Sequence, residues 1–123
     1  MQTPATTSPS KVYSLTQVAQ SIRLALERAT ANRSWLVKAE ILKISEGLGQ
    51  KTVYLDLVEE QGGRQTAKMR GVIWPQNGAE IQSELGEETA SILKSGSEVV
   101  FSARIQFHER FGLSLFIDRV DLR

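Results

Sequence analysis

The stretch KTVYLDLVEEQGGRQTAKMRGVIWP, residues 51–75, contains two runs in which apolar and polar residues alternate, joined by the connection EEQGGRQ. Alternation with a period of two is typical of a β-strand that buries one face. A short polar connection containing glycine predicts a hairpin. The stretch therefore predicts two neighbouring strands, over 51–58 and 67–74, whose expected inward residues are Val53, Leu55, Leu57, Ala67, Met69, Gly71 and Ile73.

The second run ends on Trp74, which is followed at once by Pro75 and a helical pattern. The same period places Lys68, Arg70, Val72 and Trp74 on the outward face, across the hairpin from Tyr54. Two positions for Trp74 remain open at this point. It lies exposed on that face, or it packs under the helix that follows.

The segment 76–94 has the apolar spacing of a helix, with Gly86 as a point of interruption and Gly96 as a stop. It holds four glutamates against Lys94, a net charge of −3, so the rest of the chain carries +4. Such asymmetry is compatible with a polyanionic partner, but at this size an ordinary solvated surface is the favoured explanation.

Outward from this centre, the spacing predicts a first helix over about 14–30, opened by a capping box at Ser14 and Gln17. A strand with a bulge near 42–44 follows from Trp35. Two more alternating runs, 98–107 and 113–120, are joined by the turn HERFG. Residues 1–11 are expected to form a flexible tail, and residues 12–123 a single domain.

Five strands, with a helix before the first and another between the third and fourth, predict a mainly β architecture. The pattern matches the OB-fold, a Greek-key barrel that is partly open. On this fold, oligonucleotides usually lie on the face of strands two and three and against the loops joining strands one to two and four to five.

Composition excludes several classes of function. The chain has no cysteine, so thiolate metal sites lack their ligands, and with one histidine a histidine-rich metal site or a Ser-His-Asp triad has little material. We expect no catalytic residues, no metal and no cofactor in this domain. No apolar run approaches a membrane span or a secretory signal, which predicts a cytoplasmic protein without a membrane partner.

The candidate nucleic-acid-binding residues combine flat rings, on which bases stack, with cations that neutralise phosphates. Each basic residue alone is most simply a solvated surface cation, and only the expected co-location indicates a site. The candidates are Lys38, Lys51, Tyr54, Lys68, Arg70, Trp74, Arg104, His108, Arg110 and Phe111.

In order and spacing, five segments resemble the N-terminal domain of the exodeoxyribonuclease VII large subunit. They are VYSLTQVAQSIRLALE, WLVKAEI, VYLDLVEE, MRGVIW and FGLSLFIDRVDL, and together they span Val12 to Leu122. The family's usual Gly-His-aromatic-Tyr-Phe run corresponds here to residues 50–55, where Tyr54 matches and the histidine is absent.

The resemblance implies an OB-fold module that binds single-stranded DNA and positions it for a nuclease domain later in the same chain, with a small subunit completing the enzyme. Two alternatives stay open. One is a protein-docking OB domain without affinity for nucleic acid, and the other is an OB domain that binds RNA or tRNA.

Overall fold

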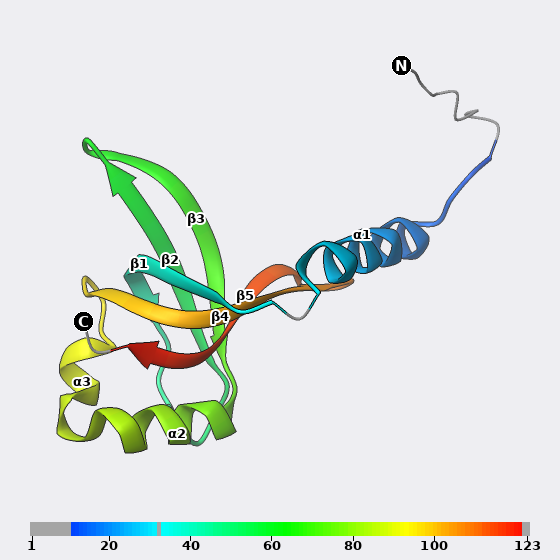
Figure 1. Cartoon of the computed structure of the whole chain (residues 1–123). Helices are drawn as coiled ribbons and strands as arrows, with labels where there is room; N and C mark the ends of the chain where they lie inside the picture. The colour runs from blue at the N-terminus through cyan, green and yellow to red at the C-terminus, as the bar shows by residue number, and fades with distance from the viewer. Residues whose placement is uncertain (1–10, 32, 122–123) are drawn as a thin grey trace.

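The computed structural model describes residues 11–31 and 33–121, which form a five-stranded barrel with helices in both predicted places (Figure 1). In chain order the elements are α1 (Leu15–Thr30), β1 (Trp35–Ile44), β2 (Val53–Gln61), β3 (Arg64–Ile73), α2 (Pro75–Leu85), η1 (Gly86–Glu88), α3 (Thr89–Ile92), β4 (Glu98–His108) and β5 (Gly112–Asp121). This is the predicted OB architecture. The predicted tail covers residues 1–11, of which 1–10 lie outside the described residues.

The barrel closes in the strand order β1-β2-β3-β5-β4. Four of the strand pairings are antiparallel. The fifth, between β3 and β5, is parallel and consists of the pairs Gly71–Leu115 and Val72–Phe116. We call these two pairs the seam, because they turn a curled sheet into a closed barrel.

Alternating side chains fill the barrel as predicted. The register of β1 against β2 shifts between Ile41 and Lys43, which is the predicted bulge. The largest fully buried side chains are Ile41, Val53, Leu55, Ile73, Ile81 and Phe101. Ile81 comes from α2, so this helix contributes to the same core as the strands.

The hairpin of β2 and β3 is longer than predicted and projects beyond the barrel (Figure 1). Its turn is Gly62-Gly63, with φ of 60° and 78°, a conformation that suits glycine in a tight hairpin. The prediction that Ala67 points into the core was wrong, because this part of β3 lies outside the barrel and Ala67 is exposed. The extra strand residues are polar on both faces, so hydrophobic alternation does not reveal them.

The segment after β3 plugs one end of the barrel. Gly86, with φ of 60°, ends α2 at the predicted point of interruption. Ile81 and Leu85 enter the core from α2, and Ile92 and Leu93 pack against it. The 76–94 region is therefore held by its apolar side, which leaves its glutamates facing solvent.

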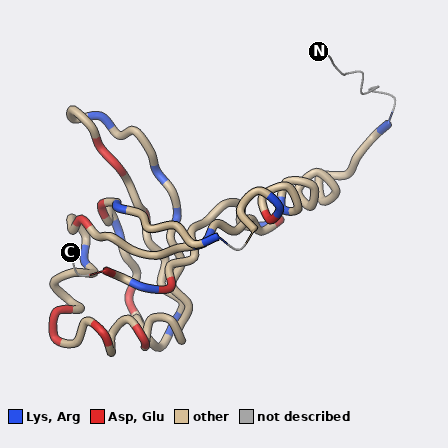
Figure 2. Tube along the Cα trace, in the orientation of Figure 1, with Lys and Arg blue, Asp and Glu red and all other residues tan. Residues whose placement is uncertain are grey.

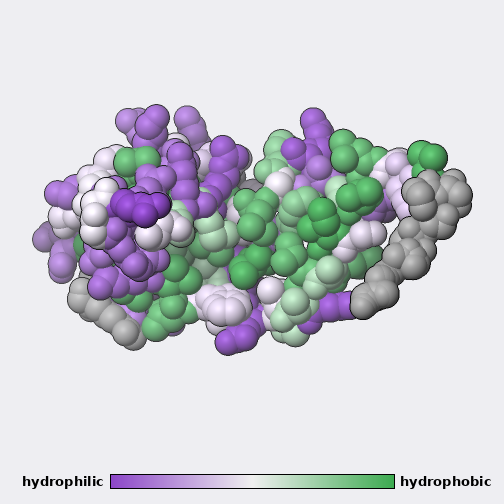
Figure 3. All heavy atoms as spheres, turned by 90° about the horizontal axis from the view of Figure 1, so that it is seen from above, coloured by the Kyte–Doolittle hydropathy of each residue, from purple (hydrophilic) through white to green (hydrophobic). Residues whose placement is uncertain are grey.

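The first helix begins with the predicted capping box. The Ser14 hydroxyl accepts the Gln17 backbone N–H at 3.1 Å, and the Gln17 side chain accepts the Ser14 N–H at 2.9 Å. α1 extends away from the barrel and packs on β4. Its Leu15, Val18 and Ile22 remain exposed, and Figure 3 shows apolar residues gathered on this half of the molecule. No described helix is long and apolar enough to cross a membrane.

Candidate nucleic-acid interface

One row of outward-facing residues crosses four strands of the barrel. Tyr54 of β2 lies opposite Val72 of β3, and Val72 lies opposite Phe116 of β5 across the seam. Phe116 in turn lies opposite Arg104 of β4. Because directly opposed side chains share a face, these four residues form a continuous line over the outer surface.

A hollow of about 380 Å³ lies along this row. Val72 forms part of it and, although it faces outward as predicted, it is only 5% exposed. The rings beside Val72 account for this burial. Trp74 lies edge-on to Phe116, with ring centroids 5.2 Å apart. Trp74 is 44% exposed and Tyr54 48%, so both leave part of a ring free for a ligand.

The position of Trp74, left open by the sequence, is therefore on the outer face and not beneath α2. Ile73 is fully buried, and the strand period sends the next residue to the opposite side. Pro75 then starts α2 immediately, with Trp74 as the N-cap residue. The backbone oxygen of Trp74 accepts the Gly78 N–H at 2.8 Å, which ties the residue to the first turn of the helix.

Two guanidinium groups lie beside the rings of this site. Arg70 lies over the Tyr54 ring, 5.2 Å from its centroid, and Arg110 lies 5.5 Å from the centroid of Phe111. Asp56 is opposite Arg70 in the ladder, yet the two make no ion pair. A guanidinium placed over a ring keeps hydrogen-bond donors at its rim for an incoming phosphate.

The turn after β4 closes one side of the hollow with a second pair of rings. His108 and Phe111 stack with centroids 4.8 Å apart and an angle of 28° between the rings. The Nδ1 atom of His108 accepts the backbone N–H of Arg110 at 3.0 Å. With Nδ1 acting as acceptor, the neutral imidazole of His108 carries its hydrogen on Nε2, and this N–H can donate a hydrogen bond to a ligand.

The structure thus brings together five of the predicted residues, Tyr54, Arg70, Trp74, His108 and Phe111, as neighbours of one hollow. Arg110 is attached to this group through Phe111. Lys68 lies further along β3, opposite Val58, towards the projecting hairpin.

Three predicted residues lie away from the hollow. Lys38 is on β1, paired with Glu98 at 3.6 Å. Lys51 lies in the loop between β1 and β2, and this loop packs on α2 through Gly49 instead of reaching the hollow. Arg104 is opposite Phe116 in the ladder, but it lines a different groove, between β4 and α1.

Four residues of the hollow were not among the predicted site residues: Val72, Gln106, Ser114 and Phe116. The signal for Phe116 is present in the sequence, because Leu115 and Ile117 on either side alternate inward. As for Trp74, an aromatic residue on the outward side of a strand raises the question whether its ring is exposed for binding or packed against another element. For Gln106 and Ser114 the side of the strand is predictable, but their nearness to Arg70 depends on how the barrel closes.

The site offers binding groups without a cluster of metal ligands. Within residues 11–31 and 33–121, no three histidine or acidic side chains lie close enough to hold a metal ion together. Rings, guanidinium groups, an amide and a hydroxyl can stack on bases and accept or donate hydrogen bonds at base edges and phosphates.

The chain was compared with solved structures, curated sequences and models of protein families. Among solved structures, the SSB domain of a protein from Synechococcus sp. matches 72% of this chain and 93% of its own length, with 18% identity and a TM-score of 0.45. No curated protein sequence matches the chain. The family model described as an OB-fold nucleic acid binding domain matches residues 13–121, nearly all of the chain. The chain therefore belongs to the family of OB-fold nucleic acid binding domains.

Proposed function

We propose that this domain binds single-stranded DNA in the hollow between β2, β3, β5 and β4, with bases against its rings and phosphates against Arg70 and Arg110. The observation that carries the proposal is the convergence of Tyr54, Trp74 and Phe116 with these cations on one outward face.

Stacking favours a single strand over a duplex. In a duplex each base face is covered by the next base pair, so Tyr54 and Trp74 have no free face to contact. In a single strand each base offers one, and stacking on an aromatic side chain contributes ~1–3 kcal/mol per base. The hollow is small, so we expect it to hold few bases and to bind weakly, with strong dependence on salt.

At a finer level, the domain is proposed to be the N-terminal module of an exodeoxyribonuclease VII large subunit. The five ordered segments spanning 12–122 support this assignment. In that setting the domain positions the strand for a nuclease domain elsewhere in the same chain, with a small subunit as a further partner. We expect the domain itself to cut no DNA, because its sequence offers no nucleophile-base pair and no closely spaced set of carboxylates.

The test is a fluorescence anisotropy titration of the purified chain with labelled oligothymidine, oligouridine and a duplex of equal length, at several salt concentrations. We expect oligothymidine to bind more tightly than the duplex, with affinity falling as salt is added. Incubation of the labelled strand with Mg²⁺ or Mn²⁺ is expected to leave it intact.

Each other outcome selects an alternative. Tighter binding of oligouridine than of oligothymidine favours an RNA-binding domain, because only RNA offers 2′-hydroxyls. No binding of any oligonucleotide at low salt, by a chain with an intact fold, overturns the proposal in favour of a protein-docking role.

A further inference from the structure

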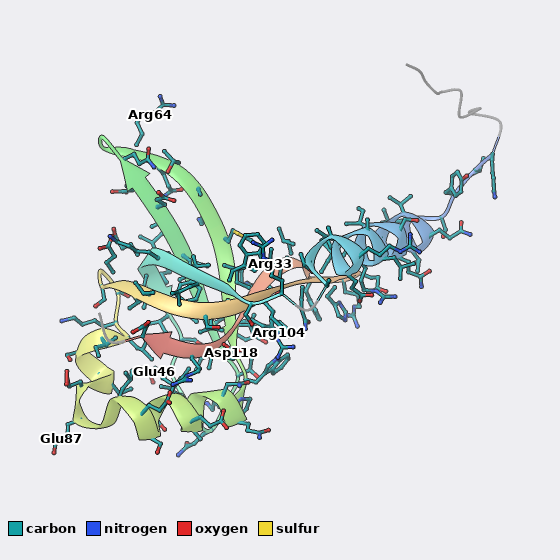
Figure 4. The ribbon with its side chains drawn as sticks, viewed as in Figure 1. Arg33, Glu46, Arg64, Glu87, Arg104 and Asp118 are labelled. Atoms are coloured by element: carbon teal, nitrogen blue, oxygen red, sulfur yellow. The ribbon has the colours of Figure 1, made fainter. Side chains whose placement is uncertain are left out.

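A groove of about 450 Å³ runs between α1 and β4, next to the hollow. Gln106 and His108 line both spaces, so the two adjoin across β4. From β4 the groove is also lined by Arg104, and from the connection after α1 by Arg33. Figure 4 labels Arg33 and Arg104, which lie near the point where α1 leads into β1.

Both acidic residues that line the groove already form ion pairs with an arginine of α1. Arg23 of α1 binds Glu27 and Glu109, each at 3.2 Å. These are the two carboxylates among the lining residues, and both form an ion pair with the same arginine. Among the described residues, Arg33 and Arg104 make no ion pair with any acid. The residues that line the groove therefore include three arginines and two glutamates, a net charge of +1, and Arg33 and Arg104 are the two arginines outside the Arg23 ion pairs.

Both free arginines are positioned by the barrel. The Arg33 guanidinium lies 4.1 Å from the centroid of the Trp35 ring, at the start of β1. Trp35 is opposite Ala103, the residue before Arg104, so the segment that carries Arg33 leads into the strand beside β4. A stacked guanidinium keeps its rim donors free and loses little conformational entropy on binding an anion.

The row across the strands leads to this groove. It passes from Tyr54 through Val72 and Phe116 to Arg104, and neighbouring strands lie about 5 Å apart. An extended polyanion that follows the row leaves the hollow over β4 and meets Arg104 and then Arg33. Of the part of the chain that the structure describes, no acidic residue lines the hollow itself.

We propose that a bound single strand continues from the hollow into the groove between α1 and β4, where Arg33 and Arg104 hold additional backbone phosphates. The inference rests on the proposed function of the hollow, and it gives α1 a role in binding. It predicts that the bound length of single strand exceeds the hollow on the barrel face. The additional contacts are expected to be electrostatic, between arginines and phosphates.

The experiment compares a short oligothymidine that fills only the hollow with a longer one, titrated into wild type, Arg33→Ala, Arg33→Lys and Arg28→Ala. Arg28 lies on α1 and carries the same charge, but it does not line the groove. Wild type is expected to bind the longer strand more tightly. Arg33→Ala is expected to leave the short strand unaffected and to lower the salt slope for the long strand by ~0.7, the value of one single-strand phosphate.

Charge is the property under test, so Arg33→Lys should restore most of the long-strand slope and Arg28→Ala should leave it unchanged. Adding Arg104→Ala to Arg33→Ala should lower the long-strand slope by a further phosphate. Thermal melting of each variant shows that the fold is retained.

Failure of this inference is distinguishable from failure of the proposed function. If wild type binds both lengths equally, or if Arg33→Ala weakens both equally, the groove does not hold the strand although the hollow does. If wild type binds neither length, both proposals are overturned together.

Discussion

Trp74 owes its position to two neighbours in the sequence and one in space. Ile73 fixes the register by its burial, Pro75 ends the strand, and Phe116 supports the ring edge-on at 5.2 Å. A ring that is already held in place loses little freedom when a base stacks on it, so most of the stacking energy is realised as affinity.

Trp74→Ala is accordingly expected to weaken binding of single strands by ~1–3 kcal/mol, whatever their base sequence. The salt slope should stay nearly unchanged, because no charge is removed. Anisotropy titrations at three salt concentrations measure both quantities. Trp74→Phe serves as the matched variant and should retain part of the affinity. A change in slope without loss of affinity would contradict the stacking role.

Arg70→Ala is expected to show the opposite signature. Its guanidinium lies over Tyr54 and forms no ion pair with an acidic residue within 11–31 and 33–121, so it is available to a phosphate. Removing it should lower the magnitude of the salt slope by about one phosphate, ~0.7 for a single strand. Arg64→Ala, at the exposed tip of the same strand, provides the control and should leave the slope as in wild type.

The residue-scale predictions from sequence were successful where a single strand decides the outcome. The side of Tyr54, Arg70 and Trp74 follows from a period of two, and each lies where that period puts it. Lys38 was also on a predictable strand, but its pairing with Glu98 depends on β1 lying beside β4, a contact between residues 60 positions apart. Local pattern carries no information on such a partner.

Among the elements, α2 is held against the loop between β1 and β2 by a glycine contact. A Cβ atom on Gly78 would lie 2.7 Å from the backbone nitrogen of Gly49 and 3.1 Å from a methyl group of Leu48. The close approach keeps this loop on α2, which explains why Lys51 does not reach the hollow. Glycine inside a helix costs up to ~1 kcal/mol relative to alanine, so packing outweighs propensity here.

Gly78→Ala is therefore expected to destabilise the domain, although alanine is the better helix former. Overpacking against backbone costs ~1–3 kcal/mol, which exceeds or offsets the propensity gain. Chemical denaturation should show a lower midpoint than wild type. Ser83→Ala, at an exposed position of α2, is the control and should be neutral or slightly stabilising. A higher midpoint for Gly78→Ala would show that the loop yields easily.

The first helix is joined to the turn after β4 through Arg23 and Glu109, at 3.2 Å. The pKa of Glu109 lies below its ordinary value of 4.5, chiefly because its own backbone N–H donates to the carboxylate, with the charge of Arg23 adding to the effect. A lowered pKa in the folded state means that the ionised form stabilises the fold. This contribution is complete above pH 4.5 and is lost as the pH falls through the folded pKa.

An NMR titration of the Glu109 side-chain carboxyl should give a midpoint below 4.5 in wild type. In Arg23→Ala the midpoint is expected to rise while remaining below that value, since the backbone hydrogen bond persists. Resonances of α1 should shift over the same acidic range in wild type. A midpoint at or above 4.5 in wild type would contradict the contact.

For the elements, the sequence predicted existence and order well and lengths less well. The capping box at Ser14 and the interruption at Gly86 are local chemistry, and both were confirmed. The end of β2 was wrong by three residues, because Glu59, Glu60 and Gln61 continue the ladder with no buried face. Hydrogen bonding between strands needs no hydrophobic pattern. The ends of the strands were predicted from that pattern, so a polar extension of the ladder was missed.

At the scale of the whole molecule, charge is separated in space as well as in sequence. Figure 2 shows acidic residues along α2 and the helical turns that follow it, the segment that plugs one end of the barrel. Glu84 binds Arg119 at 2.7 Å, while Glu80, Glu87 and Glu88 are exposed and make no ion pair within the described residues. A polyanion is repelled from that end, which leaves the outer face as the favourable approach.

The seam is the place where the barrel is expected to open transiently. Every other pair of neighbouring strands is joined over at least four residue pairs, whereas β3 and β5 share two. Opening there uncurls the sheet without breaking another ladder, so backbone amides near residues 71–72 and 115–116 should exchange with deuterated water sooner than those in mid-β2. Val72 and Phe116 also line the hollow, so a nucleic-acid strand bound there contacts both β3 and β5 and stabilises their pairing. Slower exchange at these amides on adding ligand would show that binding in the hollow and closure of the barrel are thermodynamically coupled.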